Sequence, residues 1–280
     1  MADTSAFLDQ QLVNGSLYES EQRLANRTGA LMSAKITGRP TAEVIAVYAA
    51  AARPGNGNGI VLDIGCGRGA STLALTQVLP QATVCAIDAS AALLGATRSR
   101  LRAHDLAVHT VRADFHHLPL PTGHAALAVA AFCLYHSPTP QAALGEIARC
   151  LAPGATVILA TKAADSYASL DRLVAKAGLD PDATCRPGLY GAFHSGNLRS
   201  VTEGIFTVTA VEHEAHRFRF RDLAHAAAYL ATSPKYQMPD DLAGNADAIT
   251  DHLRRTLAEG PVETASVVSY LTATRSQGRP

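Results

Sequence analysis

The stretch that decides the fold of this 280-residue chain is Val61-Leu-Asp-Ile-Gly-Cys-Gly-Arg-Gly69. It starts as a short, continuous apolar run, ends in closely spaced glycines, and is followed at 71–79 by the apolar spacing of a helix. A strand that turns into a helix through glycines lets backbone amides approach a ligand, because a Cβ at Gly65 or Gly67 would block the approach. The stretch therefore predicts a ligand-binding turn at the carboxyl end of a buried strand.

The alternation of apolar runs and helical patterns continues beyond this turn. Five runs are predicted as strands, at 60–65, 82–88, 106–114, 125–135 and 155–161, with helices expected at 91–102 and 140–151. Continuous apolar strands that alternate with helices of about three turns indicate a parallel sheet covered on both faces. Two later strands, 206–216 and 262–275, are expected as an antiparallel pair at one edge. The predicted fold is α/β, a doubly wound, seven-stranded and mostly parallel sheet.

The segments outside this alternation are predicted to cover a substrate. Helical patterns at 4–13, 19–36 and 41–52 precede the short stretch from Arg53 to Gly59, which is rich in glycine and asparagine. We expect an N-terminal helical lid over 1–58 and a ligand-binding α/β domain over 59–280. Substrate-covering inserts are expected at about 163–193 and 222–258, with helices predicted at 165–177, 195–203, 222–232 and 240–258.

The composition excludes several classes of protein. The 24 Lys and Arg residues equal the 24 Asp and Glu residues, so the excess of positive charge that gives affinity for nucleic acid is missing. Hydrophobic residues make up 48% and charged residues 17% of the chain, which argues against disorder. No signal peptide and no membrane span is recognised, so a cytoplasmic protein is expected. The five cysteines and eleven histidines form no zinc or other metal motif.

Three acids follow three successive predicted strands. Asp63 lies inside the first strand, Asp88 ends the second and Asp114 ends the third. The carboxyl ends of parallel strands form the ligand-binding edge of an open sheet. An acid at the position of Asp88 can accept from both ribose hydroxyls of a nucleoside, and Asp114 is placed to accept from an adenine amino group.

These residues resemble the class I S-adenosylmethionine (SAM) dependent methyltransferases. VLDIGCGRG looks like their first motif, AIDAS like their second-strand acid, and RADFHHLPLP like their adenine-binding turn. The segment EIARCLAPGATVILAT is similar to their fifth-strand region, although Ala155 replaces the usual second glycine and Ala125-Ala126 the usual Phe-Asp. The resemblance covers residues 60–161.

The resemblance implies SAM as cofactor and a set of site residues. The cofactor contacts expected from it are Asp63, Gly65, Cys66, Gly67, Gly69, Asp88, Ala89, Asp114, Phe115 and Phe132. His136 lies just beyond the fourth strand, where a neutral imidazole could accept the proton of an attacking hydroxyl. The alternative is a purely structural role, in which His136 only orders its loop. Contacts to the substrate are expected from Tyr18, Tyr190, His194 and Tyr236.

Three hypotheses for function follow. The first is a SAM-dependent methyltransferase that acts on oxygen or nitrogen of a small molecule, in antibiotic or other natural-product biosynthesis. The second is an NAD(P)-dependent oxidoreductase, because Gly65 to Ala70 also satisfies the dinucleotide pattern GxGxxA; Asp63 argues against it, since a carboxylate would repel a pyrophosphate. The third is a methyltransferase-fold binding protein without transfer activity. The acceptor and the oligomeric state cannot be inferred from the sequence.

Two smaller patterns are interpreted as structural. Arg217-Phe-Arg-Phe-Arg221 alternates charge and ring, which predicts an exposed edge with Phe218 and Phe220 buried. His116 and His117, next to the expected adenine turn, are predicted to be solvated.

Overall fold

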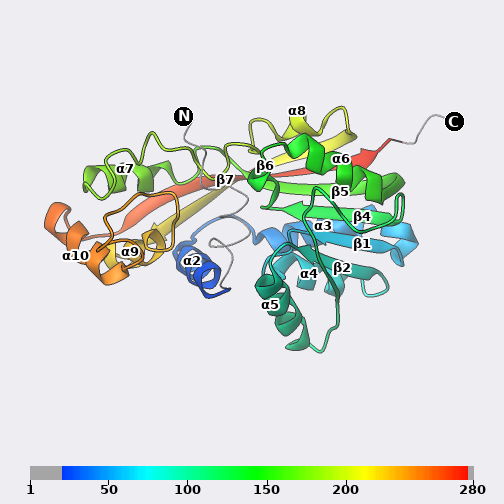
Figure 1. Ribbon diagram of the computed structural model, residues 1–280, viewed down its shortest axis with the longest axis horizontal. Helices are drawn as coiled ribbons and strands as arrows, with labels where there is room; N and C mark the ends of the chain where they lie inside the picture. Colours follow the sequence, from blue (N-terminus) through cyan, green and yellow to red (C-terminus); the bar gives the residue numbers. More distant parts are fainter. Residues whose placement is uncertain (1–20, 277–280) are drawn as a thin grey trace. The chain divides into compact units, whose positions relative to one another are not determined.

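A computed structural model describes residues 21–276 of the chain (Figure 1). The predicted helix at 4–13, the start of the one at 19–36, and Tyr18 lie outside the described residues. The strands are β1 (Ile60–Ile64), β2 (Thr83–Asp88), β3 (His109–Arg112), β4 (Ala125–Ala131), β5 (Leu151–Lys162), β6 (Phe206–Phe220) and β7 (Val262–Arg275). The α-helices are α2 (Glu21–Ala34), α3 (Thr41–Ala52), α4 (Ala70–Val78), α5 (Ala91–Arg102), α6 (Pro140–Cys150), α7 (Ala168–Lys176), α8 (Leu198–Thr202), α9 (Leu223–Leu230) and α10 (Ala246–Thr256).

The seven strands form one sheet in the order β3-β2-β1-β4-β5-β7-β6. The pairs β1–β2, β2–β3, β1–β4 and β4–β5 are parallel, and β7 is antiparallel to β5. Thr209 of β6 bonds Thr272 of β7, while Arg217 lies beside Glu263, so these two strands also run antiparallel. The order reverses at β1 and β4, where an open sheet binds its ligand. The predicted α/β fold is confirmed.

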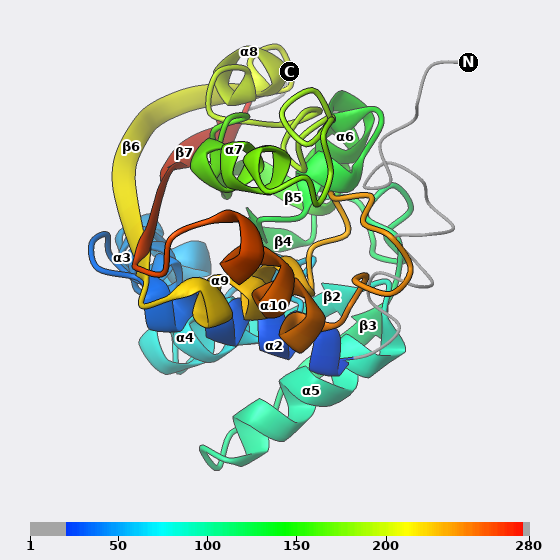
Figure 2. The ribbon, with the colours of Figure 1, turned by 90° about the vertical axis from the view of Figure 1, so that its left-hand side faces the viewer.

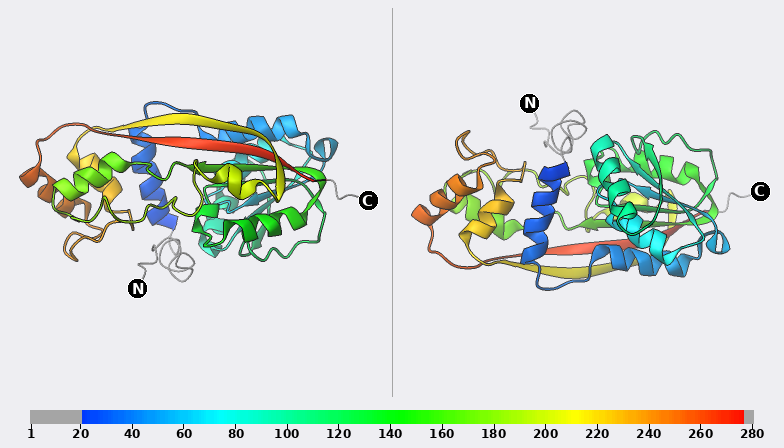
Figure 3. Two further views of the ribbon diagram at one scale, coloured as in Figure 1. Left: turned by 90° about the horizontal axis from the view of Figure 1, so that it is seen from above. Right: turned by 90° about the horizontal axis from the view of Figure 1, so that it is seen from below.

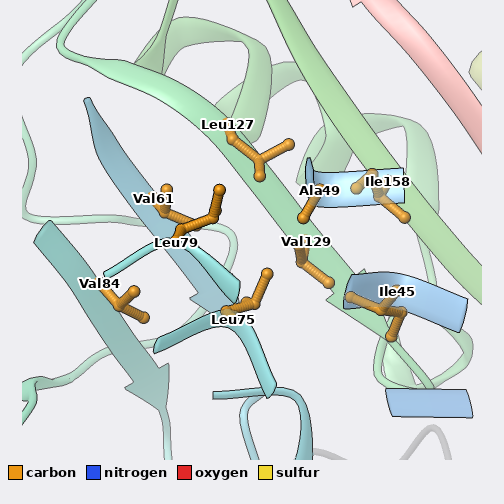
Figure 4. Close-up of a cluster of buried hydrophobic side chains, with 9 residues drawn as sticks. All are labelled: Ile45, Ala49, Val61, Leu75, Leu79, Val84, Leu127, Val129 and Ile158. Carbon is orange, nitrogen blue, oxygen red and sulfur yellow. The ribbon is translucent and has the colours of Figure 1, made fainter. Parts of the chain in front are cut away.

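Helices cover both faces of this sheet. Figure 3 views the ribbon from opposite sides, with α3, α4 and α5 over one face and α6 and α8 over the other. Apolar side chains of α3 and α4 meet those of the central strands in a core cluster of Ile45, Ala49, Val61, Leu75, Leu79, Val84, Leu127, Val129 and Ile158 (Figure 4). This core packs α4 against β1, and the loop between them is the glycine turn.

The chain divides into two compact units. The sheet unit contains residues 39–162 and 192–213 and the chain from Val268 on, and the helical unit contains the described residues up to Gly38 with 163–191 and 214–267. The lid was predicted to end at residue 58, whereas the division lies after Gly38. The reason is that α3 packs Ile45 and Ala49 into the core of the sheet.

Helices α2, α9 and α10 of the helical unit pack together, α9 against both of the others (Figure 2). Phe218 and Phe220 are buried, at 2% and 0% exposed, whereas the side chains of Arg217 and Arg219 are 63% and 55% exposed and lie near Glu263. The predicted burial of the phenylalanines and exposure of the arginines are confirmed. The predicted exposed edge is corrected, because Lys35 forms a bridge with Phe218 and the Ile36 N–H donates to the Arg217 carbonyl at 2.9 Å. No helix among the described residues is long and apolar enough to cross a membrane.

Some element boundaries differ from the prediction. The fourth strand was expected to reach residue 135, but it ends at Ala131 because Phe132 adopts a left-handed conformation with φ of 57°. The fifth strand begins at Leu151, four residues earlier than expected, and passes through Pro153 and Gly154. The helix predicted at 240–258 is confined to α10. The local backbone conformation and the pairing of strands decide where strands and helices end, and the spacing of apolar residues alone does not show these boundaries.

Candidate functional site at the carboxyl edge of the sheet

The three glycines of the turn after β1 differ in their surroundings. All have positive φ: Gly65 63°, Gly67 56° and Gly69 75°. A Cβ on Gly65 would lie 2.4 Å from the Cβ of Cys133, and one on Gly69 would lie 2.8 Å from Thr97. Among the residues that the structure describes, a Cβ on Gly67 would meet nothing within 4 Å. Protein side chains thus occupy the space beside Gly65 and Gly69, whereas the space beside Gly67 is open among the described residues. The predicted cofactor contacts of the three glycines stay predictions.

Asp63 holds the turn to the helix that follows it. Asp63 is buried, at 1% exposed. Its carboxylate accepts hydrogen bonds from the Thr72 hydroxyl at 2.5 Å and from the Ser71 hydroxyl at 2.9 Å. Burial raises the pKa of Asp63 to about 6, against the lowering effect of these two hydrogen bonds; the charge of Asp88 raises it further. This acid therefore ties β1 to the first turn of α4, and its predicted contact with the cofactor stays a prediction.

Asp88, at the end of β2, faces the same turn. The Gly67 N–H donates to its Oδ2 at 2.9 Å, and the Ser90 N–H donates to its Oδ1 at 2.9 Å. Burial raises the pKa of Asp88, and the hydrogen bonds from the backbone oppose this effect. Each carboxylate oxygen can accept a second hydrogen bond. The structure thus brings Asp88 and Gly67 together, and the predicted contact of Asp88 with the cofactor stays a prediction.

Cys66 and Ala89 take part in this region through their backbones. The Cys66 N–H donates to the Ile87 carbonyl at 3.0 Å, and the Ala89 carbonyl accepts from Arg112 Nε at 3.0 Å. The Cys66 thiol is buried, and burial raises its pKa. A buried, protonated thiol is a weak nucleophile, so Cys66 shapes the turn and does not attack a substrate.

Asp114 lies just beyond β3 and is joined to the next loop. Its Oδ1 accepts from both the backbone N–H and Nδ1 of His116, each at 2.8 Å, while Nε2 of His116 lies 2.8 Å from the Ser137 hydroxyl. The Phe115 ring lies 4.7 Å from the His116 ring. His116 was predicted to be solvated; its side chain is 17% exposed and bonded at both nitrogens. The sequence analysis pointed to neither bond; the two-residue spacing of Asp114 and His116 is the signal that could have indicated the first.

Phe132 and His136 flank the loop after β4. The Phe132 N–H donates to the Ala160 carbonyl at 2.8 Å, and the ammonium of Lys162 lies 5.1 Å from the Phe132 ring centre. His136 is 6% exposed, within a short 3-10 turn, with its ring 4.5 Å from that of Tyr135. A left-handed residue at the end of a strand is a strained feature that clusters at functional sites. Lys162, which lies beside this predicted cofactor contact, was not singled out from the sequence.

The candidate substrate residues lie in different units. His194 belongs to the sheet unit, where its Nδ1 accepts from the Gly196 N–H at 3.1 Å. Tyr190 and Tyr236 belong to the helical unit. Tyr190 is 7% exposed, and the Tyr236 hydroxyl donates to Asp171 at 2.9 Å. Their roles in binding a substrate, like that of Tyr18, stay predictions. Among the described residues, no three His, Cys, Asp or Glu side chains gather in a way that could hold a metal ion.

Comparison with known proteins identifies the region that carries this edge. The sequence model of the family described as "Methyltransferase domain" matches residues 61–154, from β1 into β5. Residues 61–154 form a methyltransferase domain. The resemblance to the class I SAM-dependent methyltransferases is thereby confirmed.

A curated relative and two solved structures extend the comparison. A malonyl-[acyl-carrier protein] O-methyltransferase of Alcanivorax borkumensis is 34% identical over 128 residues, which are 46% of this chain and 43% of the relative. The chain thus matches less than half the length of that protein. A Bacillus halodurans C-125 protein with a provisional methyltransferase name has a TM-score of 0.55 at 16% identity, covering 79% of this chain and 94% of its own. The [4+2]-cyclase SpnF has a TM-score of 0.53 at 19% identity, covering 84% and 82%.

Proposed function

We propose that the whole chain is a SAM-dependent methyltransferase that acts on a small organic acceptor. The observation that carries the proposal is the pairing of Gly67 with Asp88: a glycine whose missing side chain opens into free space, beside a carboxylate held by the Gly67 N–H. A carboxylate at the end of the second strand suits the two ribose hydroxyls of a nucleoside. The methyltransferase domain assigned to residues 61–154 includes both residues.

The residues of this edge fit SAM as the cofactor. Asp88 would accept from the ribose, Asp114 from the adenine amino group, and Phe115 would flank the adenine ring. The turn from Gly65 to Gly69 would face the methionine part of the cofactor. When bound, SAM supplies a methyl group on a positively charged sulfur, which leaves as a neutral thioether. The acids of this edge favour such a cation and disfavour a pyrophosphate.

Transfer needs an acceptor atom in line with the methyl–sulfur bond. The lone pair of an acceptor oxygen or nitrogen would form the new bond to the methyl carbon that bound SAM would supply, with the electron pair of the carbon–sulfur bond left on the thioether sulfur. Alignment of the two reactants supplies much of the rate by proximity. His136 is proposed to accept the proton that a hydroxyl acceptor loses. The relative from Alcanivorax is named as an O-methyltransferase, which favours oxygen as the acceptor atom.

The finer parts of the proposal rest on the sequence. They are a role in antibiotic or other natural-product biosynthesis, a small-molecule partner in place of nucleic acid or a membrane, and a substrate-covering role for 163–193 and 222–258. The neutral net charge supports the choice of partner.

Calorimetric titration with S-adenosylhomocysteine (SAH) and, separately, with NAD tests the cofactor. We expect SAH to bind and NAD to give no heat of binding. Binding of NAD without binding of SAH would favour the oxidoreductase hypothesis. The likeness to a protein named as a cyclase shows that this fold does not by itself imply transfer. Turnover of methyl-labelled SAM with candidate acceptors separates an enzyme from a binding protein, which would hold SAM and transfer nothing.

A further inference from the structure

One imidazole spans the space between two loops at the carboxyl edge of the sheet. His116 Nδ1 lies 2.8 Å from Asp114 Oδ1, and His116 Nε2 lies 2.8 Å from the Ser137 hydroxyl. Ser137 is fully buried at 0% exposed, and it is 21 residues away from His116 in the sequence. The turn after β3 and the loop after β4 are thus linked by one side chain.

The donors and acceptors of this link allow a single arrangement with a neutral ring. The Asp114 carboxylate can only accept, so Nδ1 carries the proton and donates to it. Nε2 then accepts from the Ser137 hydroxyl. The Ser137 oxygen in turn accepts from the Thr139 N–H at 3.0 Å. Both ring nitrogens of His116 and the Ser137 hydroxyl thus have hydrogen-bond partners, which makes the link rigid.

The first end of the link is the proposed adenine contact. Oδ1 of Asp114 accepts both hydrogen bonds from His116, whereas Oδ2 has no donor in the part of the chain that the structure describes. The Asp114 side chain is 43% exposed. Oδ2 is therefore the oxygen that can accept from an adenine amino group, while Oδ1 holds the imidazole.

The second end of the link is the loop that carries the proposed base. Ser137 directly follows His136, and the Ser137 N–H donates to the Leu134 carbonyl at 3.0 Å. The His136 N–H donates to the Cys133 carbonyl at 3.0 Å. These bonds close the short turn around His136. Formation or loss of the hydrogen bond at the Ser137 hydroxyl therefore affects the turn that positions His136.

We propose that His116 is a positioning residue that couples adenine binding at Asp114 to the order of the loop 133–139, so that the site around His136 is completed when the cofactor binds. This inference rests on the proposed function, because it needs an adenine-containing ligand at Asp114. A ligand that holds Asp114 restricts His116, and His116 restricts Ser137. By reciprocity, a loop ordered through Ser137 strengthens cofactor binding by the same factor.

Amide hydrogen exchange with and without SAH tests this coupling. In the wild type, SAH should slow exchange in 65–69 and 114–118 and also in 133–139, the last by about fivefold or more. Ser137→Ala removes the far end of the link together with the acceptor of the Thr139 N–H, so the effect of SAH is compared with the exchange of the same variant without SAH. His116→Asn keeps an amide N–H near the position of Nδ1 and removes Nε2. In both variants, SAH should still protect 65–69, and its effect on 133–139 should be lost.

A double variant and a matched control complete the design. His116→Asn and Ser137→Ala together should do no more than either alone, because both cut the same link. His117→Asn changes the exposed neighbouring histidine and should behave as the wild type. Thermal unfolding of each variant without SAH shows that it is folded.

The outcomes separate the inference from the proposed function. Failure of the wild type to bind SAH would remove the proposed function and this inference with it. If SAH binds and protects 133–139 equally in the wild type and in both single variants, the coupling through His116 is wrong, and the proposed function stands. Additive effects of the two substitutions would also overturn it, because they would then act on separate contacts.

Discussion

The turn after β1 has an inner and an outer side, and the two are built from the same residue types. On the inner side, Asp63 accepts from the hydroxyls of α4 and Gly65 makes room for Cys133. On the outer side, Asp88 accepts from the Gly67 N–H and Gly67 faces free space. An acid and a glycine thus assemble the turn on one side, and the same pair of residue types borders open space on the other.

This difference separates stability from binding. Inner residues are surrounded by protein, so their replacement creates a clash or unpaired polar groups within the core. Outer residues keep hydrogen-bonding capacity or space that the protein itself does not use. Substitutions on the inner side should lower the free energy of unfolding, and those on the outer side should lower the affinity for SAH.

The largest effect is expected from Gly65→Ala. Its Cβ would lie 2.4 Å from the Cβ of Cys133 at a positive φ, and overpacking together with left-handed strain should cost about 4 kcal/mol of unfolding free energy. Gly67→Ala is the matched control, where only the left-handed conformation costs about 1 kcal/mol. Urea unfolding measures both values, and calorimetry should show that Gly67→Ala weakens SAH binding. Equal losses of unfolding free energy in the two variants would contradict the difference between the inner and the outer side of the turn.

The second effect is a pH dependence of stability that originates at Asp63. Burial raises its pKa in the folded protein from 3.8 to about 6, so between these values the folded state binds a proton that the unfolded state has lost. The free energy of unfolding therefore falls as the pH rises from about 4 to about 6, by up to about 3 kcal/mol. Asp63→Asn should remove this contribution. Urea titrations at several pH values measure it, and an identical slope in the variant would contradict the assignment.

The third effect is on binding at the outer side. Asp88→Ala should weaken SAH binding by about 2 kcal/mol, or roughly 30-fold, as expected for loss of a charged hydrogen-bond partner. The affinity of Asp88→Asn for SAH should lie between those of Asp88→Ala and the wild type, because the amide keeps one acceptor oxygen. Calorimetric titration gives the affinities. An unchanged affinity in Asp88→Ala would remove this residue from the site and leave the outer side without its main polar group.

The sheet was predictable because its strands carry strong patterns. The run that becomes β1 and the run that becomes β2 are apolar on both faces, which buried parallel strands require. The end of β4 was not predictable, since the left-handed conformation of Phe132 is not marked by a glycine. The start of β5 at Leu151 depends on pairing with Ala125 of β4, a contact that no local pattern reports.

The sequence predicted where the residues of the candidate site lie on the sheet, but not which side chains contact one another. Asp88 and Asp114 were placed at the ligand edge because parallel strands end there. The link from Asp114 through His116 to Ser137 joins the ends of β3 and β4, which lie apart in the chain. Long-range hydrogen bonds between side chains follow from three-dimensional proximity, so a single sequence does not reveal them.

The sequence by itself determined the α/β class, the turn from Gly65 to Gly69 and the acids at its edge, because hydrophobic period and backbone freedom are local properties. Only the tertiary structure decided which acid and which glycine are enclosed by protein and which lie beside open space. That choice depends on what each Cβ or carboxylate meets: Cys133 beside Gly65, free space beside Gly67, and the hydroxyls of α4 beside Asp63. Neighbours of this kind come from distant parts of the chain and exist only once it has folded.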